Sequence, residues 1–204
     1  PVTKTYEDSP VELGVRFSSA TSGFVKGIRF FSANNVSGTY TGHLWTADGS
    51  LLASAVFTNV TANGWQEVLF SEPVKIETGV IYVASYYNSS GIYAATSQGL
   101  SEAVNNGNSL TTSVNDGKGT GGVYTYNGPG FPTETYNATN YWVDVLFASG
   151  PYEFKLSSVT DSISCSTTGD LQTLTVTPSP CTQQRQVLTT QSAPTQKPVL
   201  VETN

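Results

Sequence analysis

Aromatic side chains gather in two segments of the chain and are the residues best suited to bind a ligand. Aromatic rings pack on the apolar C–H faces of sugar rings, while nearby amides and hydroxyls bond the sugar hydroxyls. Aromatic rings also fill strand faces in a core, so each ring has a structural alternative. The candidate ligand-binding residues are Tyr86, Tyr87, Tyr93, Tyr124, Tyr126, Phe131, Tyr136 and Trp142.

Catalytic chemistry has little support in the sequence. The single histidine, His43, lies in a predicted strand on the face opposite Leu44. No Gly-x-Ser-x-Gly stretch is present to place a nucleophile, and one strand histidine cannot supply a triad. Two carboxylates held about 5–9.5 Å apart could hydrolyse a glycoside, but the sequence pairs no two of them. We therefore expect a protein that is not an enzyme and needs no cofactor.

A structural calcium ion is the one metal that the sequence suggests. Ca²⁺ prefers six to eight oxygen ligands from carboxylates, carbonyls and water. Glu12 on the first predicted long strand and Asp144 on the last could meet at one edge of a sandwich. The pairing resembles the structural calcium sites of sugar-binding jelly rolls. In the alternative reading, Asp144 alternates with the apolar Val143 and Val145 and simply faces solvent.

Composition and charge narrow the classes of partner. Charged residues are only 12% of the chain, the net charge is −6, and the basic residues form no cluster. Nucleic acid and anionic membranes are therefore disfavoured as partners. No apolar run approaches the ~20 residues of a membrane-spanning helix, so no membrane insertion is expected. The chain begins at Pro1 and contains no Met, which suggests a mature or excised fragment of a secreted or cell-surface protein.

Two cysteines, Cys165 and Cys181, lie in the C-terminal part of the chain without a Cys/His cluster. Zinc is therefore disfavoured. In a secreted protein, one disulfide between them is the expected state. Two free buried thiols are the alternative.

Short segments rich in Val, Ile, Phe, Tyr and Thr recur between turn signals and predict an all-β protein. Apolar residues alternate in several of them, as in Tyr141–Phe147, which is typical of strands with one face in a core. Asp48-Gly49 predicts a hairpin with a type I′ turn. The Asn-, Ser- and Gly-rich stretch Gly99–Gly122 predicts a long surface excursion. The predicted strands are Val11–Phe17, Gly23–Phe31, Tyr40–Ala47, Leu51–Phe57, Trp65–Phe70, Val80–Tyr87, Gly91–Ala95, Val123–Tyr126 and Tyr141–Phe147.

The composition changes after Gly150-Pro151, which divides the chain into two parts. Residues 1–150 predict a jelly-roll-like antiparallel β-sandwich domain. Residues 151–204 are rich in Thr, Ser, Gln and Pro and contain strand-like pieces. We expect them to form an extended or β appendage, which either packs on the same chain or adds a strand to a neighbouring molecule.

Several motifs along residues of roughly 11–147 resemble the domain-of-unknown-function family 4082, a module of bacterial secreted and surface proteins. They include Gly27-Ile28-Arg29-Phe30-Phe31, Thr41-Gly42-His43-Leu44-Trp45 and Asn140-Tyr141-Trp142-Val143-Asp144-Val145. The resemblance implies a jelly-roll sandwich like those of carbohydrate-binding modules. The family tends to carry histidines at two places that Tyr87 and Ile92 occupy here. A ligand site that used those histidines would be altered in this chain.

Together these features lead to two expected functions. The first is a non-catalytic extracellular binding or adhesion module, directed at a glycan or surface polymer. The alternative is a structural subunit of an extracellular fibre or surface assembly, in which the C-terminal tail pairs with a neighbouring copy of the chain.

Overall fold

A computed structural model describes residues 4–105, 109–112 and 121–150, together with four short strands in the C-terminal part. The strands of residues 4–150 are β1 (Lys4–Glu7), β2 (Val11–Ser19), β3 (Gly23–Phe31), β4 (Tyr40–Thr46), β5 (Leu51–Val56), β6 (Trp65–Ile76), β7 (Ile81–Asn88), β8 (Ile92–Ala95), β9 (Leu110–Thr112), β10 (Gly122–Thr125) and β11 (Val143–Ser149). No helix occurs in the described part of the chain, and accordingly none there could cross a membrane.

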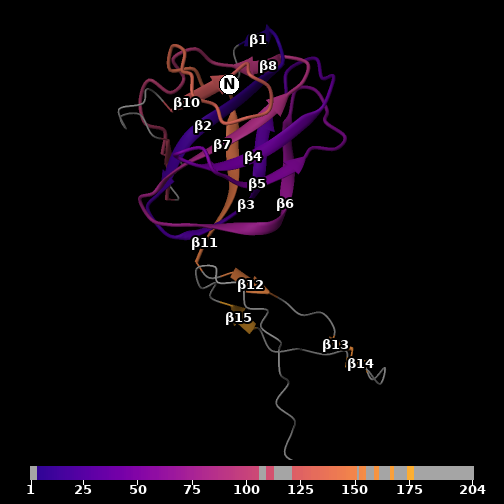
Figure 1. Cartoon of the computed structure of the whole chain (residues 1–204), viewed down its shortest axis with the longest axis vertical. Helices are drawn as coiled ribbons and strands as arrows, with labels where there is room; N and C mark the ends of the chain where they lie inside the picture. Colours follow the sequence, from indigo (N-terminus) through magenta and orange to yellow (C-terminus); the bar gives the residue numbers. More distant parts are fainter. Residues whose placement is uncertain are drawn as a thin grey trace, which may run out of the picture.

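Two antiparallel sheets pack against each other (Figure 1). The larger sheet has the strand order β10-β2-β7-β4-β5, with β9 also paired to β2, and the smaller sheet has the order β11-β3-β6. The chain crosses repeatedly between the sheets, because β2, β4 and β7 lie in one and β3, β6 and β11 in the other. The predicted all-β antiparallel sandwich is therefore confirmed.

The core lies between the sheets and follows the predicted alternation. Along β2, the apolar residues Val11, Leu13, Val15 and Phe17 are buried in it. The ring of Phe30 stacks on those of Tyr40 and Tyr86 and meets that of Phe57 edge-on, with ring centroids 4.2–5.2 Å apart. Tyr86, a candidate ligand-binding residue, is 1% exposed and belongs to this core.

The outer face of the larger sheet is also covered. Trp45, Val83 and Val123 form a second apolar cluster there, and Phe131 packs on it from the loop after β10. The rings of Trp45 and Phe131 lie 5.9 Å apart. Phe131 therefore anchors the loop to the sheet. This packing gives Phe131, a candidate ligand-binding residue, a structural role. Figure 1 shows β10 and its following loop in the upper part of the sandwich.

The turn between β4 and β5 and the stretch that follows Gly99 both differ from the prediction. The β4–β5 hairpin at Asp48-Gly49 forms as predicted, but only Gly49 has a positive φ (96°). A type I′ turn needs positive φ at both central positions, so the turn belongs to another type. Part of the predicted surface excursion is packed: Leu100 and Leu110 are buried in the core, and β9 pairs with β2.

The C-terminal strands pair among themselves. β12 (Tyr152–Phe154) pairs with β15 (Leu174–Val176), and β13 (Val159–Thr160) pairs with β14 (Ser166–Thr167). Within the described residues, neither pair extends a sheet of the sandwich. Cys165 and Cys181 lie outside the described residues, so the disulfide stays a prediction.

Candidate functional site: a tyrosine-lined cleft

A short strand at the N-terminus closes one end of the sandwich and builds a cleft there. β1 pairs with β8, and Tyr6 lies opposite Tyr93 in this pair. Their rings stack with centroids 5.5 Å apart and an interplanar angle of 13°. The N–H of Asp8 continues the pairing by donating to the carbonyl of Gly91 over 3.0 Å. In Figure 1, β1, β8 and β10 share the upper end of the sandwich.

Six tyrosines from four segments of the chain line this cleft, which has a volume of about 500 Å³. Tyr93 and Tyr141 are buried at its floor, whereas Tyr126 and Tyr136 are 42% and 61% exposed. Neighbouring rings are steeply inclined, with interplanar angles of 63–69° for the pairs 93/141, 124/126 and 124/141. The cleft therefore presents both ring faces and hydroxyls to a ligand. The six are Tyr6, Tyr93, Tyr124, Tyr126, Tyr136 and Tyr141.

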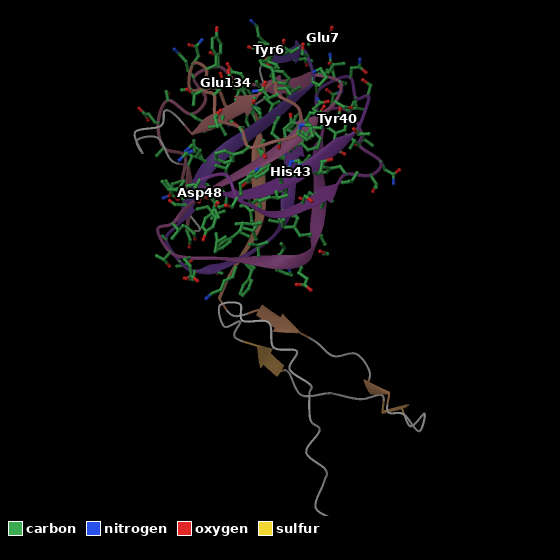
Figure 2. The ribbon with its side chains drawn as sticks, in the orientation of Figure 1. Tyr6, Glu7, Tyr40, His43, Asp48 and Glu134 are labelled. Carbon is green, nitrogen blue, oxygen red and sulfur yellow. The ribbon has the colours of Figure 1, made fainter. Side chains whose placement is uncertain are left out.

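Acidic side chains flank the tyrosines. The carboxylate of Asp8 accepts hydrogen bonds from the hydroxyls of Tyr126, over 2.6 Å, and Tyr93, over 3.5 Å. Glu134 pairs through its backbone with Tyr124, and its negative charge contributes to raising the pKa of the Tyr124 hydroxyl, after burial. Figure 2 shows Glu134 at the same end of the sandwich as Tyr6. The exposed Asp8 carboxylate has room for a further donor from a ligand.

The hydroxyls of Tyr93 and Tyr141 remain neutral well into the alkaline range. Burial, followed by the negative charge of Asp8, raises the pKa of Tyr93 from 10.0 to about 12. Burial likewise raises the pKa of Tyr141. Neutral phenols both donate and accept hydrogen bonds, which is what recognition of sugar hydroxyls requires.

A loss of stability at high pH follows from the Tyr93 pKa. The unfolded chain loses the phenolic proton near pH 10, but the folded chain holds it to about pH 12. Between these values the unfolded state binds fewer protons, so the free energy of unfolding falls as the pH rises. We expect the Tm to fall across this window, and to fall less in Tyr93→Phe. Thermal melts across this pH range measure the Tm, and absorbance at 295 nm reports the ionisation of the phenols. A Tm that stays constant while all phenols titrate near pH 10 would contradict the prediction.

Gly91 allows the chain to bring Asp8 to the cleft. It has a φ of +71°, and a Cβ there would lie 2.0 Å from the carbonyl oxygen of Asp8. Gly79 has a nearly identical φ of +72° but nothing within 4 Å of a Cβ. A substitution at Gly79 therefore measures the cost of the backbone strain alone, without a steric clash. That strain costs about 1–2 kcal/mol in a non-glycine residue.

We therefore expect Gly91→Ala to lower the free energy of unfolding clearly more than Gly79→Ala does. We also expect faster amide exchange in β1 for Gly91→Ala alone. Urea unfolding and hydrogen exchange measure both effects. Equal effects of the two substitutions would show that the contact with Asp8 does not matter.

Most of the amino-acid sequence matches one known protein family. The family described as Domain of unknown function (DUF4082) matches residues 1–143. The chain belongs to this family. No curated protein matches the chain. The matched region spans β1 to β10 and contains all the residues that line the cleft. The candidate site therefore lies within the family's domain, but the family's description gives it no function.

The structure brings together four of the eight aromatic residues singled out in the sequence: Tyr93, Tyr124, Tyr126 and Tyr136. Tyr86 and Phe131 pack in the two apolar clusters, and Tyr87 is half-buried on β7. Trp142 lies at a smaller, separate cleft of about 210 Å³. There its indole N–H donates to the hydroxyl of Thr96 over 3.0 Å, and its ring meets that of Trp65.

The expected calcium pair of Glu12 and Asp144 does not form. Their neighbours Val11, Leu13, Val143 and Val145 face the core, so the two carboxylates point outward from opposite sheets. Asp144 instead accepts hydrogen bonds from the guanidinium of Arg29, over 2.5 and 3.1 Å. These residues do not fit a shared Ca²⁺ ion, and no three His, Cys, Asp or Glu side chains of the described residues gather into a metal site.

Glu12 belongs to a buried polar network on the outer face of the larger sheet. Its Oε1 atom lies 2.8 Å from Nδ1 of His43 and accepts a hydrogen bond from Ser85 over 2.5 Å. The indole N–H of Trp45 donates to Ser85 over 2.8 Å. Glu12 is 0% exposed and His43 is 7% exposed. His43 is therefore buried in contact with Glu12. Figure 2 shows His43 well away from the end of the sandwich that bears Tyr6.

Burial raises the pKa of Glu12, and the contacts with His43 and Ser85 offset that effect only in part. The second carboxylate oxygen, Oε2, is buried without a hydrogen bond of normal geometry. A buried carboxylate in this position depends strongly on its imidazole partner.

Proposed function

We propose that this chain is a non-catalytic binding module of a secreted or cell-surface protein, and that it binds a glycan in the tyrosine-lined cleft. One observation carries the proposal: six tyrosines and a carboxylate converge on one open cleft at the end of the sandwich. Such a site pairs apolar ring faces with a few polar groups, which is the usual character of a small-ligand site.

The dimensions of the cleft suit a short stretch of sugar. Its volume of about 500 Å³ lies within the range of roughly 300–1,000 Å³ that is usual for ligand pockets. The exposed rings of Tyr126 and Tyr136 provide surfaces for sugar C–H faces, and the hydroxyls and Asp8 provide partners for sugar hydroxyls. The net charge of −6 and the low number of basic residues disfavour a polyanionic ligand.

Non-catalytic action is supported by the position of the single histidine. His43 is buried and paired with Glu12, so it does not offer a base to the cleft. The one carboxylate that lines the cleft, that of Asp8, already accepts hydrogen bonds from tyrosine hydroxyls.

An array of immobilised oligosaccharides, probed with the full chain, tests the proposal. We expect retention on a restricted set of glycans, with release by the same sugar in solution. Absence of retention on every glycan would overturn the proposal. Retention that persists unchanged in a variant with both Tyr126 and Tyr136 replaced by alanine would show that binding occurs elsewhere.

Assembly into a fibre or surface layer is the second candidate function, and the free edges of the sheets favour it. β5 is one of the two edge strands of the larger sheet, and β6 is one of the two edge strands of the smaller sheet. Leu51, Val56 and Leu69 on these strands are 52%, 61% and 64% exposed. Exposed apolar edge strands are natural places for pairing with another chain.

For assembly, we expect sedimentation to show oligomers of the full chain that dissociate on Val56→Lys or on deletion of residues 151–204. A monomer at all concentrations would exclude this function for the isolated chain. Oligomers that both changes leave intact would exclude the edge and the tail as their contacts.

A further inference from the structure

The electrostatic character of the cleft is acidic at the end where its tyrosines are most exposed. Asp8 is exposed, and its carboxylate is approached by two tyrosine hydroxyls, from Tyr93 and Tyr126. Glu134 adds a second carboxylate beside Tyr124. A carboxylate that accepts two neutral hydroxyls keeps its full negative charge and further lone pairs for a ligand.

The ring faces of the cleft that Asp8 also lines add to this preference. The π faces of aromatic rings carry partial negative charge, so they attract cations that lie within about 6 Å of the ring centroid. Tyr124, Tyr126 and Tyr141 are inclined to one another by 63° and 69°, so their faces do not all point the same way. Aromatic walls of differing orientation beside a carboxylate are a suitable environment for an organic ammonium group.

One basic residue also lines the cleft, and it lies at the other end. Lys4 and Asp8 are four residues apart on an extended segment, which places their Cα atoms about 13 Å apart. The cleft therefore has one basic end and one acidic end, and the acidic end carries the exposed Tyr126 ring.

Given that the cleft binds a sugar, as proposed above, we infer that the sugar is an amino sugar whose protonated amino group lies between the Asp8 carboxylate and the surrounding tyrosine rings. A divalent metal ion fits this place less well, because Ca²⁺ prefers six to eight oxygen ligands. The described residues bring no three acidic or metal-ligating side chains together. An ammonium group needs only one carboxylate, a few neutral acceptors and ring faces, all of which are present here.

Calorimetric titration of the full chain with two probes tests the inference: a β-1,4-linked trimer of glucosamine and the N-acetylated trimer of the same linkage. The glucosamine trimer carries free amino groups that can be protonated, whereas acetylation converts them into neutral amides. At a pH below the pKa of that amine, we expect the glucosamine trimer to bind about tenfold tighter or more, because a charge-assisted hydrogen bond replaces a neutral contact. High salt should weaken this preference.

Three variants assign the preference to its residue. Asp8→Asn removes the charge and is expected to reduce the preference to about twofold or less. Asp48→Asn is the matched control, because Asp48 also accepts a hydroxyl hydrogen bond but lies far from the cleft (Figure 2). Tyr126→Phe keeps the ring and the carboxylate and is expected to keep the preference.

The outcomes separate the inference from the function on which it rests. Equal affinity for the two trimers, or a preference that survives Asp8→Asn, overturns the amino-sugar inference and leaves sugar binding intact. Failure of both trimers and of every glycan on the array overturns the proposed function, and the inference falls with it.

Discussion

Replacement of His43 by alanine is expected to lower the free energy of unfolding by about 3–5 kcal/mol. The imidazole is a hydrogen-bond partner of a carboxylate that is 0% exposed. Without it, Glu12 keeps only the Ser85 hydroxyl as a strong donor, and its Oε2 atom is already without a hydrogen bond of normal geometry. The remaining carboxylate must then either stay charged in the interior or take up a proton.

A double replacement separates the loss of the pair from the loss of packing. In Glu12→Met combined with His43→Leu, both polar groups are exchanged for apolar ones of similar size. Such exchanges are often neutral or stabilising, so we expect most of the stability to return. Urea unfolding of the two single variants and the double variant measures this. Additive losses, or a His43→Ala variant within about 1 kcal/mol of the unmodified chain, would contradict a coupled buried pair.

The second large effect concerns ligand affinity. In a variant with Tyr126→Ala and Tyr136→Ala, we expect the affinity for a bound oligosaccharide to fall about 100-fold or more. Each ring is worth about 1.4 kcal/mol or more, which corresponds to a factor of ten in affinity. Both rings are largely exposed, so the fold has little need of them.

The matched control for this variant is a pair of exposed apolar residues outside the cleft. Leu51→Ala with Val56→Ala removes side chains of comparable exposure from β5. We expect both double variants to melt near the temperature of the unmodified chain, but only the tyrosine variant to lose affinity in calorimetry. A parallel loss in the β5 variant would point to a binding surface on the sheet edge.

Much of the sandwich could be predicted from the sequence because alternation records which face of a strand is buried. The alternation of Tyr141, which precedes β11, with Val143 and Val145 on β11 is reproduced in the core. The alternation also places Phe24, Ile28 and Phe30 on one face of β3, and here it misled. A register shift between Val25 and Gly27 moves Val25 into the core with Ile28 and leaves Phe24 outside that cluster. A bulge inserts one residue and reverses the faces, and only Gly27 hints at its place.

The two long-range sites could be predicted only in part. Four cleft tyrosines were identified from their local clustering, but Tyr6 and Asp8 were not, because β1 is a short polar strand that reads as a loop. Its place depends on pairing with β8, which lies more than 80 residues further along the chain. Similarly, Glu12 reads as an exposed residue in an alternating strand, since nothing local shows that the segment with Phe131 covers that face.

Tyrosine-selective NMR of the full chain, titrated with a glycan retained on the array, tests the central claim most directly. The chain has 11 tyrosines, and six of them line the cleft. We predict saturable shifts in the ring signals of Tyr93, Tyr124, Tyr126 and Tyr136, whereas those of the core residues Tyr40 and Tyr86 stay in place. Saturation with the cleft signals unmoved, or with shifts confined to tyrosines outside the cleft, would contradict a sugar site at this end of the sandwich.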